Sequence, residues 1–278
     1  DPDMYFPDGN ATITRLLVRA LVPDAVQATE MEDIVTARVD YRQLDRPDHN
    51  CRIRLNSTVV DVRHLNDEQV QTSFVTGDQA YSVKSRNVVM ACWNTVIPYL
   101  CPDIPPAQKE ALAYGVKSPL VYTGVLLSNW QSFVDTGIRG VSAPTSFFSS
   151  IGLQPSTRMG DYATSRDPAE PIVLRMSAYF DVPDSDLSRR EQHLLGRQKL
   201  LSTPFSEFES AIRDQLTRVL GNAGFDHQRD ILGITVNRWP HGYSYSYTRC
   251  PIPTNGPIPP PRSVRRSSVG SVWAVSAS

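Results

Sequence analysis

The aromatic run near the end of the sequence has residue types and a spacing suited to a binding surface. In "RWPHGYSYSYT", Tyr243, Tyr245 and Tyr247 alternate, so on a strand their rings share one face. Trp239 precedes them in the same run. A cationic or partly cationic nitrogen is attracted to the face of an aromatic ring by roughly 0.5–2 kcal/mol. The run therefore predicts either an amine-binding wall or the packed face of an ordinary strand.

Polar side chains that could act beside such a wall are few. Lys117 lies in "YGVKSPLVY", and His241 lies inside the aromatic run. A lone lysine is ordinarily a solvated surface charge, and a lone histidine is ordinarily a hydrogen-bonded structural residue, so His241 is left unassigned. Asp8 could either cap a turn or face a cofactor.

The cysteines do not predict a metal site. Cys51, Cys92, Cys101 and Cys250 are scattered without CxxC or another ligand spacing. Pairing of Cys92 with Cys101 is conceivable, but buried free thiols are the favoured interpretation.

Composition is that of an ordinary globular chain. Of its 278 residues, 40% are hydrophobic and 21% are charged. A net charge of −1 gives no reason to expect nucleic acid or an anionic membrane as a partner. Apolar runs stay well short of the ~20 residues that a spanning helix needs, and no signal peptide is visible. We expect a soluble protein, with the compartment (cytoplasm or periplasm) left open.

Several segments must position the aromatic run. A helix is expected after Asn10, which can cap it, with Pro23 ending it. Its apolar stripe comprises Ile13, Leu16, Leu17, Ala20 and Leu21. Three β segments follow, "TVVDVRHL", "VQTSFVTG" and "AYSVKSRNVVMA", with short turns that imply an antiparallel meander. The apolar run at residues 87–92, "NVVMAC", predicts a strand buried on both faces of a parallel sheet.

The middle of the chain mixes strands and helices. Strands are expected at "PLVYTGVLL", "EPIVLRMSAYF" and "DILGITVNRW", and a short helix at "PAQKEALAYG". The clearest helix is "STPFSEFESAIRDQLTRVLG", capped by Ser202 or Thr203 and closed by Gly221. Its expected buried face comprises Phe205, Phe208, Ile212, Leu216 and Val219.

The last segment, residues 250–278, has a different composition. It lacks Asp and Glu and is dense in Pro, Ser and Arg, without helical or strand periodicity. Either a disordered tail or a frameshifted translation of a GC-rich gene would give this composition. We expect no chemistry from it.

Taken in order, these segments resemble the flavin-dependent amine oxidases and dehydrogenases, and most of all the bacterial spermidine dehydrogenase-like proteins. The order is a glycine turn with its helix, "LNSTVVDV", the meander, "VVMACWN", "LAYGVKSPLVY" and "NRWPHGYSYSY". The likeness extends from Tyr5 to about Arg249. It implies a flavoprotein with a discontinuous Rossmann-type FAD-binding domain and a substrate domain built on a mixed sheet.

The resemblance implies a set of FAD-binding residues. Val59 matches the valine whose backbone N–H and C=O pair with the adenine edge. Ala91, Cys92 and Trp93 match the strand and turn beside the dinucleotide. Gly9 matches the family's glycine turn, where the backbone comes close to other chain segments.

The resemblance also implies residues for the reaction. Lys117 matches the lysine that the family holds near flavin N5, usually through a water. Trp239, Tyr243 and Tyr245 match the segment that lines the flavin and substrate region. The implied reaction is hydride transfer from an amine or a spermidine-like polyamine to FAD, with the electron acceptor unknown.

Two FAD-binding elements of that family are not found in the sequence. One is the GxGxxG turn with its later ribose-binding acid, and the other is a final glycine-rich stretch whose helix faces the pyrophosphate. We therefore expect a chain that is incomplete at both ends, lacks the N-terminal Rossmann unit, and is inactive as given. Haem is possible in such proteins but is not supported by the sequence.

The expected fold class is α/β with α+β character, a two-domain FAD-binding amine-oxidase-type fold. Residues 1–97 would be a remnant of the FAD-binding domain, and residues 98–235 the substrate domain. Residues 236–249 would return toward the FAD domain, and residues 250–278 would form the anomalous tail.

Two alternatives to the amine-oxidising fragment remain. An FAD-dependent oxidase or desaturase of a non-amine substrate would share the domain plan. A non-catalytic binding module on the same scaffold is favoured by the missing glycine motif, so whether this chain is an enzyme stays open.

Overall fold

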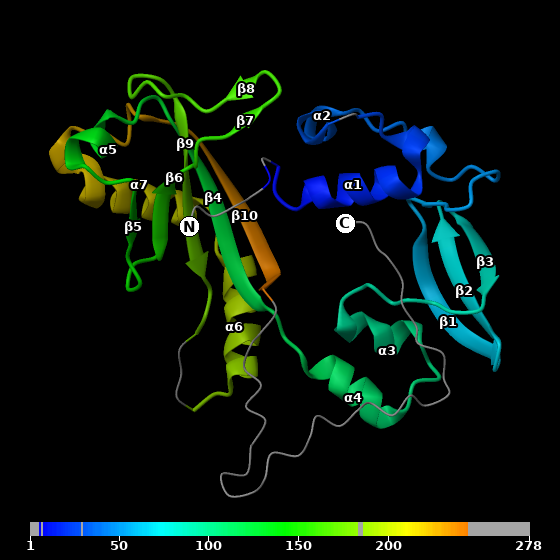
Figure 1. The fold of residues 1–278 in the computed structure, drawn as a ribbon. Helices are drawn as coiled ribbons and strands as arrows, with labels where there is room; N and C mark the ends of the chain where they lie inside the picture. Colours follow the sequence, from blue (N-terminus) through cyan, green and yellow to red (C-terminus); the bar gives the residue numbers. More distant parts are fainter. Residues whose placement is uncertain (1–5, 7, 29, 183–185, 244–278) are drawn as a thin grey trace, which may run out of the picture. The chain divides into compact units, whose positions relative to one another are not determined.

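The structure is a computed structural model that describes residues 6, 8–28, 30–182 and 186–243 (Figure 1). The chain divides into two compact units. Among the described residues, the first, here the sheet unit, comprises residues 6–52 and 116–243, and the second, the meander unit, comprises Ile53–Gly115. The expected boundary at residues 97 and 98 falls inside the meander unit, and the domain roles stay a prediction.

A five-stranded antiparallel sheet organises the sheet unit. Its order is β10–β4–β9–β6–β5. The strands are β4 (Ser118–Leu127), β5 (Gly140–Ser142), β6 (Ser150–Leu153), β9 (Ile172–Tyr179) and β10 (Ile231–Tyr243). Residues of β9 alternate between buried and exposed or half-buried, as expected for a strand with one covered face. The three strands predicted in this part of the chain are confirmed.

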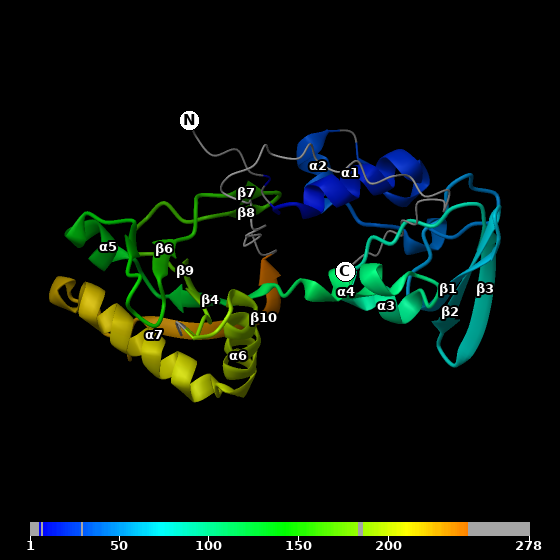
Figure 2. The same cartoon turned by 90° about the horizontal axis from the view of Figure 1, so that it is seen from below.

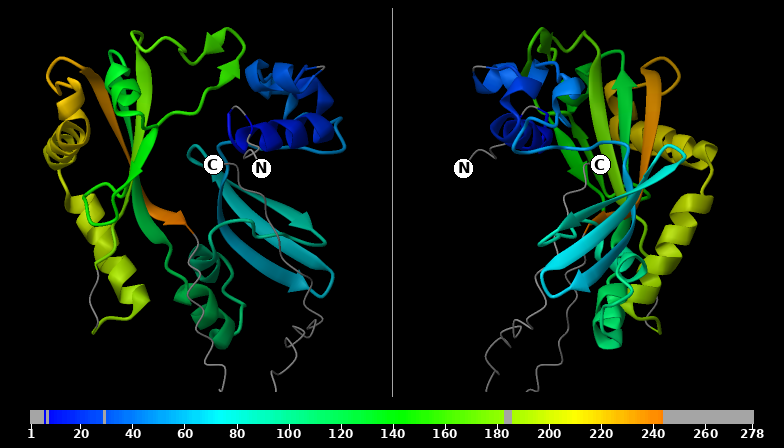
Figure 3. Two further views of the ribbon diagram at one scale, coloured as in Figure 1. Left: turned by 60° about the vertical axis from the view of Figure 1, so that its left-hand side comes forward. Right: turned by 90° about the vertical axis from the view of Figure 1, so that its right-hand side faces the viewer.

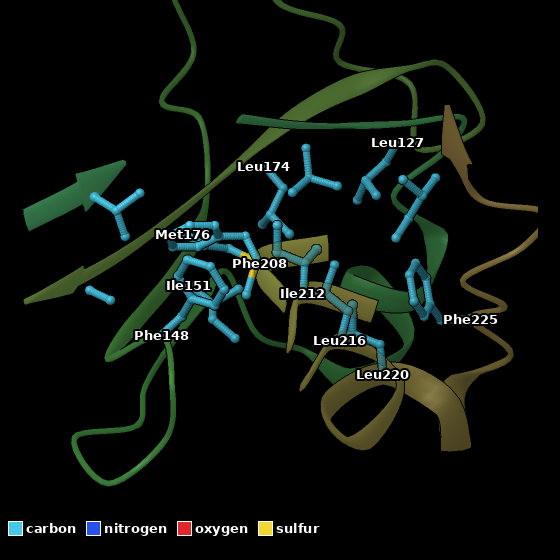
Figure 4. Close-up of a cluster of buried hydrophobic side chains, with 14 of the residues drawn as sticks. Leu127, Phe148, Ile151, Leu174, Met176, Phe208, Ile212, Leu216, Leu220 and Phe225 are labelled. Atoms are coloured by element: carbon cyan, nitrogen blue, oxygen red, sulfur yellow. The ribbon is translucent and has the colours of Figure 1, made fainter. Parts of the chain in front are cut away.

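Two helices cover one face of that sheet. They are α6 (Arg189–Ser202) and α7 (Phe205–Leu220), and Figures 2 and 3 show both on the same side of the strands. Between α7 and the sheet lies a core that includes Leu127, Leu174, Met176, Phe208, Ile212, Leu216 and Leu220 (Figure 4). Helices on one face of an antiparallel sheet give the α+β character that the sequence predicts.

The ends of α7 differ from the prediction. The hydroxyls of Ser202 and Thr203 both donate to the carbonyl of Lys199, so they close α6 instead of capping α7. Pro204 is the residue before α7, and its fixed φ suits that position. Phe205 is 47% exposed, because the helix turns its first residue away from the core. Gly221 stays in helical geometry, and Gly224, at φ +82°, ends the segment.

A polar clamp fixes α7 to the loop before β6. Gln215 is buried, and its side-chain amide donates to the Phe148 carbonyl at 2.8 Å. Its side-chain carbonyl accepts from the Phe148 backbone N–H at 3.1 Å. Both polar groups of a buried amide are therefore satisfied by one loop residue, which defines the position of the helix along the sheet.

The first helix of the sheet unit is α1 (Ala11–Leu21), where the sequence predicts it. Asn10 makes no side-chain capping bond, so that prediction is wrong. Asp8 binds the start of the helix instead: its carboxylate accepts a hydrogen bond from the Thr12 hydroxyl and lies 3.7 Å from Arg15 Nε. The apolar stripe is uncovered in this structure, with Ile13, Leu17 and Leu21 between 44% and 59% exposed.

Short elements connect α1 to the rest of the chain. These are η1 (Pro23–Ala25), α2 (Met31–Thr36) and η2 (Tyr41–Gln43), with a single antiparallel bridge between Val26 and Val39. Beyond β4 the sheet unit also has α5 (Gln131–Thr136), η4 (Gly221–Ala223) and a small hairpin of β7 (Arg158–Met159) and β8 (Tyr162–Ala163).

The meander unit contains the antiparallel sheet that the sequence predicts. Its strands are β1 (Thr58–Asn66), β2 (Gln69–Thr76) and β3 (Gln79–Ser85), in the order β1–β2–β3. Short helices follow, η3 (Asn94–Val96), α3 (Ile97–Leu100) and α4 (Pro106–Tyr114), and α4 ends before Gly115 as expected.

The expected buried parallel strand at residues 87–92 does not form. Residues 87–92 carry only an isolated bridge residue at Val89, and none of their side chains is fully buried. Val88 and Met90 instead pack against a small cluster around Val62, Val70 and Cys101. The apolar side chains of this run are therefore partly buried against one face of the meander, and the run does not enter a sheet as a strand.

The prediction of buried free thiols holds in part for the described residues, because Cys101 is buried but Cys51 and Cys92 are only half-buried. Cys51, Cys92 and Cys101 are free thiols, and burial raises the pKa of Cys101. Cys250 lies outside the described residues. Among the helices of the described ranges, none combines the length and apolar character needed to cross a membrane.

Candidate functional site

The face of the five-stranded sheet that α6 and α7 do not cover is here called the open face. Residues opposite each other on paired strands point to the same side, so the register identifies its members. Trp239 is opposite Leu120, and Leu120 is opposite Tyr179. Tyr122 is opposite Asn237 on one side and Ser177 on the other. Trp239 and Tyr179 are 53% and 56% exposed, so large aromatic side chains stand uncovered on this face.

Three tyrosines meet on the open face and are here called the tyrosine cluster: Tyr122, Tyr179 and Tyr243. The hydroxyls of Tyr122 and Tyr243 are 2.8 Å apart and form a hydrogen bond. The ring centroids of Tyr179 and Tyr243 are 6.5 Å apart, with the planes tilted by 38°. Neighbouring strands β10, β4 and β9 each supply one member, so the sheet itself sets their spacing.

The hydroxyl of Tyr122 remains protonated over the physiological range. Burial, and then the hydrogen bond with Tyr243, raise the pKa of Tyr122 to about 12, which the positive charge of Arg175 partly opposes. Two phenols share one hydrogen bond, so one O–H and several lone pairs remain available to a ligand. The pair can therefore both donate to and accept from a small polar group.

A close backbone approach allows β10 to carry Tyr243 to this position. The register shifts between Trp239 and Tyr243, and Gly242 lies within that shift. A Cβ at Gly242 would lie 2.5 Å from Leu120 Cδ2 and 2.8 Å from the Ser118 carbonyl oxygen. Only glycine fits there without displacing β4, and the irregularity re-aims the end of β10.

Basic groups gather where β4 begins. Lys117 immediately precedes β4 and is half-buried, and Ser118 is opposite Tyr243. Arg197 of α6 donates through Nε to the Pro240 carbonyl at 3.0 Å. Burial, then the charges of Arg197 and Lys117, lower the pKa of His241, so its imidazole is neutral at pH 7. Lys117 and the tyrosine cluster thus lie at the same end of the sheet.

A histidine of α6 ties the helix to this same end. His193 is buried, and its Nε2 is 3.3 Å from Ser118 Oγ and 3.4 Å from Asp181 Oδ1. These contacts hold α6 against the first residue of β4 and against Asp181, which follows β9. We assign His193 a structural role.

The predicted site residues are divided between the two units. Lys117, Trp239 and Tyr243 lie in the sheet unit, as does Gly9, which has φ +69° and nothing within 4 Å of the place its Cβ would occupy. Tyr245, and with it Tyr247, lies outside the described residues.

The predicted FAD-binding residues Val59, Ala91, Cys92 and Trp93 belong to the meander unit. Val59 is half-buried in β1, and Cys92 and Trp93 are half-buried beside the start of η3. In the part of the chain that the structure describes, β1 pairs only with β2, so one edge of its backbone is not used in the sheet.

The sequence interpretation missed Tyr122, Tyr179 and Arg175. All three lie in strands that were predicted correctly, and alternation could have assigned each to the exposed side. Their meeting with Tyr243 could not be found that way, because Tyr122 and Tyr243 are 121 positions apart and strand pairing decides the contact.

Two further observations concern the site and its surroundings. Within the described ranges, no group of three or more His, Cys, Asp or Glu side chains is arranged to hold a metal ion. A polar hollow of about 470 Å³ lies elsewhere in the sheet unit, and two of its charged residues form local ion pairs, Asp40 with Arg42 Nε at 2.9 Å and Arg46 with Asp48 at 2.6 Å. Its lining comprises Asp24, Ala25, Gln27, Arg38, Asp40, Gln43 and Arg46.

Comparisons with known proteins gave matches among solved structures only. Models of protein families and curated proteins gave no match. Wild-type putrescine oxidase bound to putrescine aligns at a TM-score of 0.46 and 12% identity, over 65% of this chain and 34% of that one. Cyclohexylamine oxidase from Brevibacterium oxydans aligns at 0.42 and 14%, over 65% and 33%. A CLA-producing fatty acid isomerase from P. acnes aligns at 0.43 and 10%, over 76% and 38%. The chain spans about a third of the length of these structures.

Proposed function

We propose that this chain is part of an FAD-dependent oxidoreductase that oxidises the C–N bond of an amine. In this proposal the open face of the five-stranded sheet forms one wall of the substrate site. The observation that carries the proposal is the tyrosine cluster: with Trp239 it makes an exposed aromatic surface on a sheet whose other face is covered by α6 and α7. The ordered sequence segments that resemble flavin-dependent amine oxidases supply the reaction class.

The chain's own residues would bind and orient the amine. Aromatic faces attract the nitrogen and exclude water, and the phenol pair can hydrogen-bond it. Lys117, at the start of β4, is the proposed catalytic residue that would hold a water near the flavin. When bound, FAD would accept the hydride that leaves the carbon beside the nitrogen.

The residues present suit one end of FAD better than the other. Val59 lies on a strand with one unpaired edge in the described residues, which suits backbone contacts to adenine. Gly9 has nothing within 4 Å of the place its Cβ would occupy, which leaves room for a ligand there. The sequence holds no GxGxxG turn, the element that binds the pyrophosphate. We therefore propose an incomplete FAD site.

A non-catalytic binding module is the second candidate. The lack of a GxGxxG turn favours it, because an aromatic face can bind a ligand without a flavin. This candidate differs from the first in one expected result, namely that the open face does not bind a flavin ring.

Titration of the full chain with riboflavin, followed by flavin fluorescence, separates the two candidates. We expect weak saturable quenching, weakened at least threefold by Trp239→Leu, because base–aromatic and ring stacking of this kind contributes about 1–3 kcal/mol. Tyr162→Leu, which removes an exposed ring on β8, is the matched control and should leave the quenching unchanged. If riboflavin fluorescence is not quenched, or if Trp239→Leu and Tyr162→Leu weaken the quenching equally, the open face does not bind a flavin.

A further inference from the structure

We propose that the open face selects its substrate by charge, taking a monoamine with a flat apolar body and rejecting diamines and polyamines. This inference rests on the proposed function and narrows its substrate class. It departs from the spermidine-like substrate that the sequence resemblance implies. The positive charge of Arg175 beside the tyrosine cluster carries it.

Arg175 lies on the open face next to Tyr122. It is opposite Gly124 on β4, and Tyr122 is opposite Ser177, so Arg175 and Tyr122 are diagonal neighbours on adjacent strands. Side chains in this relation are roughly 7–8 Å apart at Cα and within reach of long residues. Arg175 is exposed, and its charge acts on the Tyr122 hydroxyl. A cation therefore borders the place where an amine would bind.

The other charges of the sheet do not offset Arg175. The sequences of β4, β5, β6, β9 and β10 contain no Asp or Glu. Arg238, on β10, turns to the helix side: its guanidinium carbon lies 5.1 Å from the Phe208 ring centroid, and it donates to the Leu201 carbonyl. The five strands thus present a positive open face.

Such a face treats amines differently according to their charge. A diamine at neutral pH carries two ammonium groups, and its distal ammonium would need a carboxylate that these strands do not supply. Repulsion by Arg175 also weakens the binding of each ammonium group, most strongly at low ionic strength. A monoamine can lay its flat body on Tyr179 and Trp239. Its neutral nitrogen can then accept the remaining O–H of the phenol pair.

Intrinsic fluorescence titration of the full chain at pH 7.5 and constant ionic strength tests this inference with three probes. Benzyl alcohol is a neutral flat ligand, benzylamine has the same ring with one charge, and putrescine has two charges and no ring. We expect benzyl alcohol to bind most tightly, benzylamine about threefold to tenfold more weakly, and putrescine without saturation. Putrescine binding as tightly as benzyl alcohol, or no saturable response to any probe, would overturn the inference.

Charge reversal identifies the residue responsible. Arg175→Glu should strengthen benzylamine binding about fivefold and make putrescine binding saturable, while benzyl alcohol changes less than twofold. Arg175→Gln should give a smaller change in the same direction. Arg86→Glu, an exposed reversal in the meander unit, is the control and should change none of the three. Unchanged binding of both cations in Arg175→Glu would contradict the inference. None of these probes requires a flavin, so failure here is distinguishable from failure of the riboflavin titration.

Discussion

Replacement of Gly196 by alanine is expected to lower the free energy of unfolding of the sheet unit by about 3 kcal/mol, the upper part of the range for overpacking. A Cβ at Gly196 would lie 1.6 Å from the Phe180 carbonyl oxygen and 3.2 Å from Pro119 Cγ. The contact is with backbone, which cannot rotate away, so α6 would have to move off the sheet. Urea unfolding followed by circular dichroism measures the change.

Displacement of α6 would also break contacts at the end of the candidate site where Lys117 and Arg197 lie. The Arg197 bond to the Pro240 carbonyl and the His193 contact with Ser118 both depend on the helix position. Gly233→Ala is the control, because Gly233 lies in β10 with nothing within 4 Å of the place of its Cβ. It should stay within about 0.5 kcal/mol of wild type. Equal destabilisation by the two substitutions would contradict the close-packing account.

Replacement of Phe208 by alanine is expected to cost about 4 kcal/mol, because a fully buried ring leaves a cavity that its neighbours cannot fill. Phe208 is 0% exposed and packs edge-on against Phe147 at 5.7 Å between centroids. It also contacts Phe180, the residue after β9, and the Arg238 guanidinium of β10, so it links α7 to the end of β9 and to β10. The same unfolding experiment applies.

Phe205→Ala on the same helix is the matched control for Phe208. Phe205 precedes Phe208 by three residues and is 47% exposed, so its loss should cost less than about 1 kcal/mol. The comparison holds residue type and helix constant and varies only burial. Similar costs at the two positions would show that α7 does not pack as described.

Strand and helix positions in the sheet unit could be predicted from the sequence because each has a strong local pattern. β9 alternates along its length, and α7 repeats apolar residues at helical spacing. The helix caps could not be predicted in the same way. The hydroxyls of Ser202 and Thr203 can serve either the helix before them or the helix after them, and the tight turn between α6 and α7 decides for the first.

The run at residues 87–92 shows a different limit of local patterns. A continuous apolar stretch fits a buried strand, but it fits equally well a segment that covers one face of a neighbouring sheet. Val88 and Met90 do the latter against β1 and β2. Which of the two forms is decided by partners that the local pattern does not specify.

The candidate site depended most on information that is not local. Lys117, Trp239 and Tyr243 could be chosen from the sequence, but Tyr122, Tyr179 and Arg175 join them only through the β10–β4–β9 pairing. The charge of the open face follows from the same pairing. The sequence alone is compatible with a polyamine substrate. Only the strand pairing shows that Arg175 lies beside the tyrosine cluster, and this position favours a monoamine.

Parallel titration of the full chain with FAD and riboflavin tests the central claim most directly, namely that the chain holds a flavin-facing aromatic wall without a pyrophosphate-binding turn. If that claim holds, both ligands quench weakly and their dissociation constants agree within about threefold, because phosphates gain nothing without a helix N-terminus or glycine turn to bind them. Tight, stoichiometric binding of FAD, with riboflavin a hundredfold or more weaker, would show a working pyrophosphate site in this chain and would contradict the account.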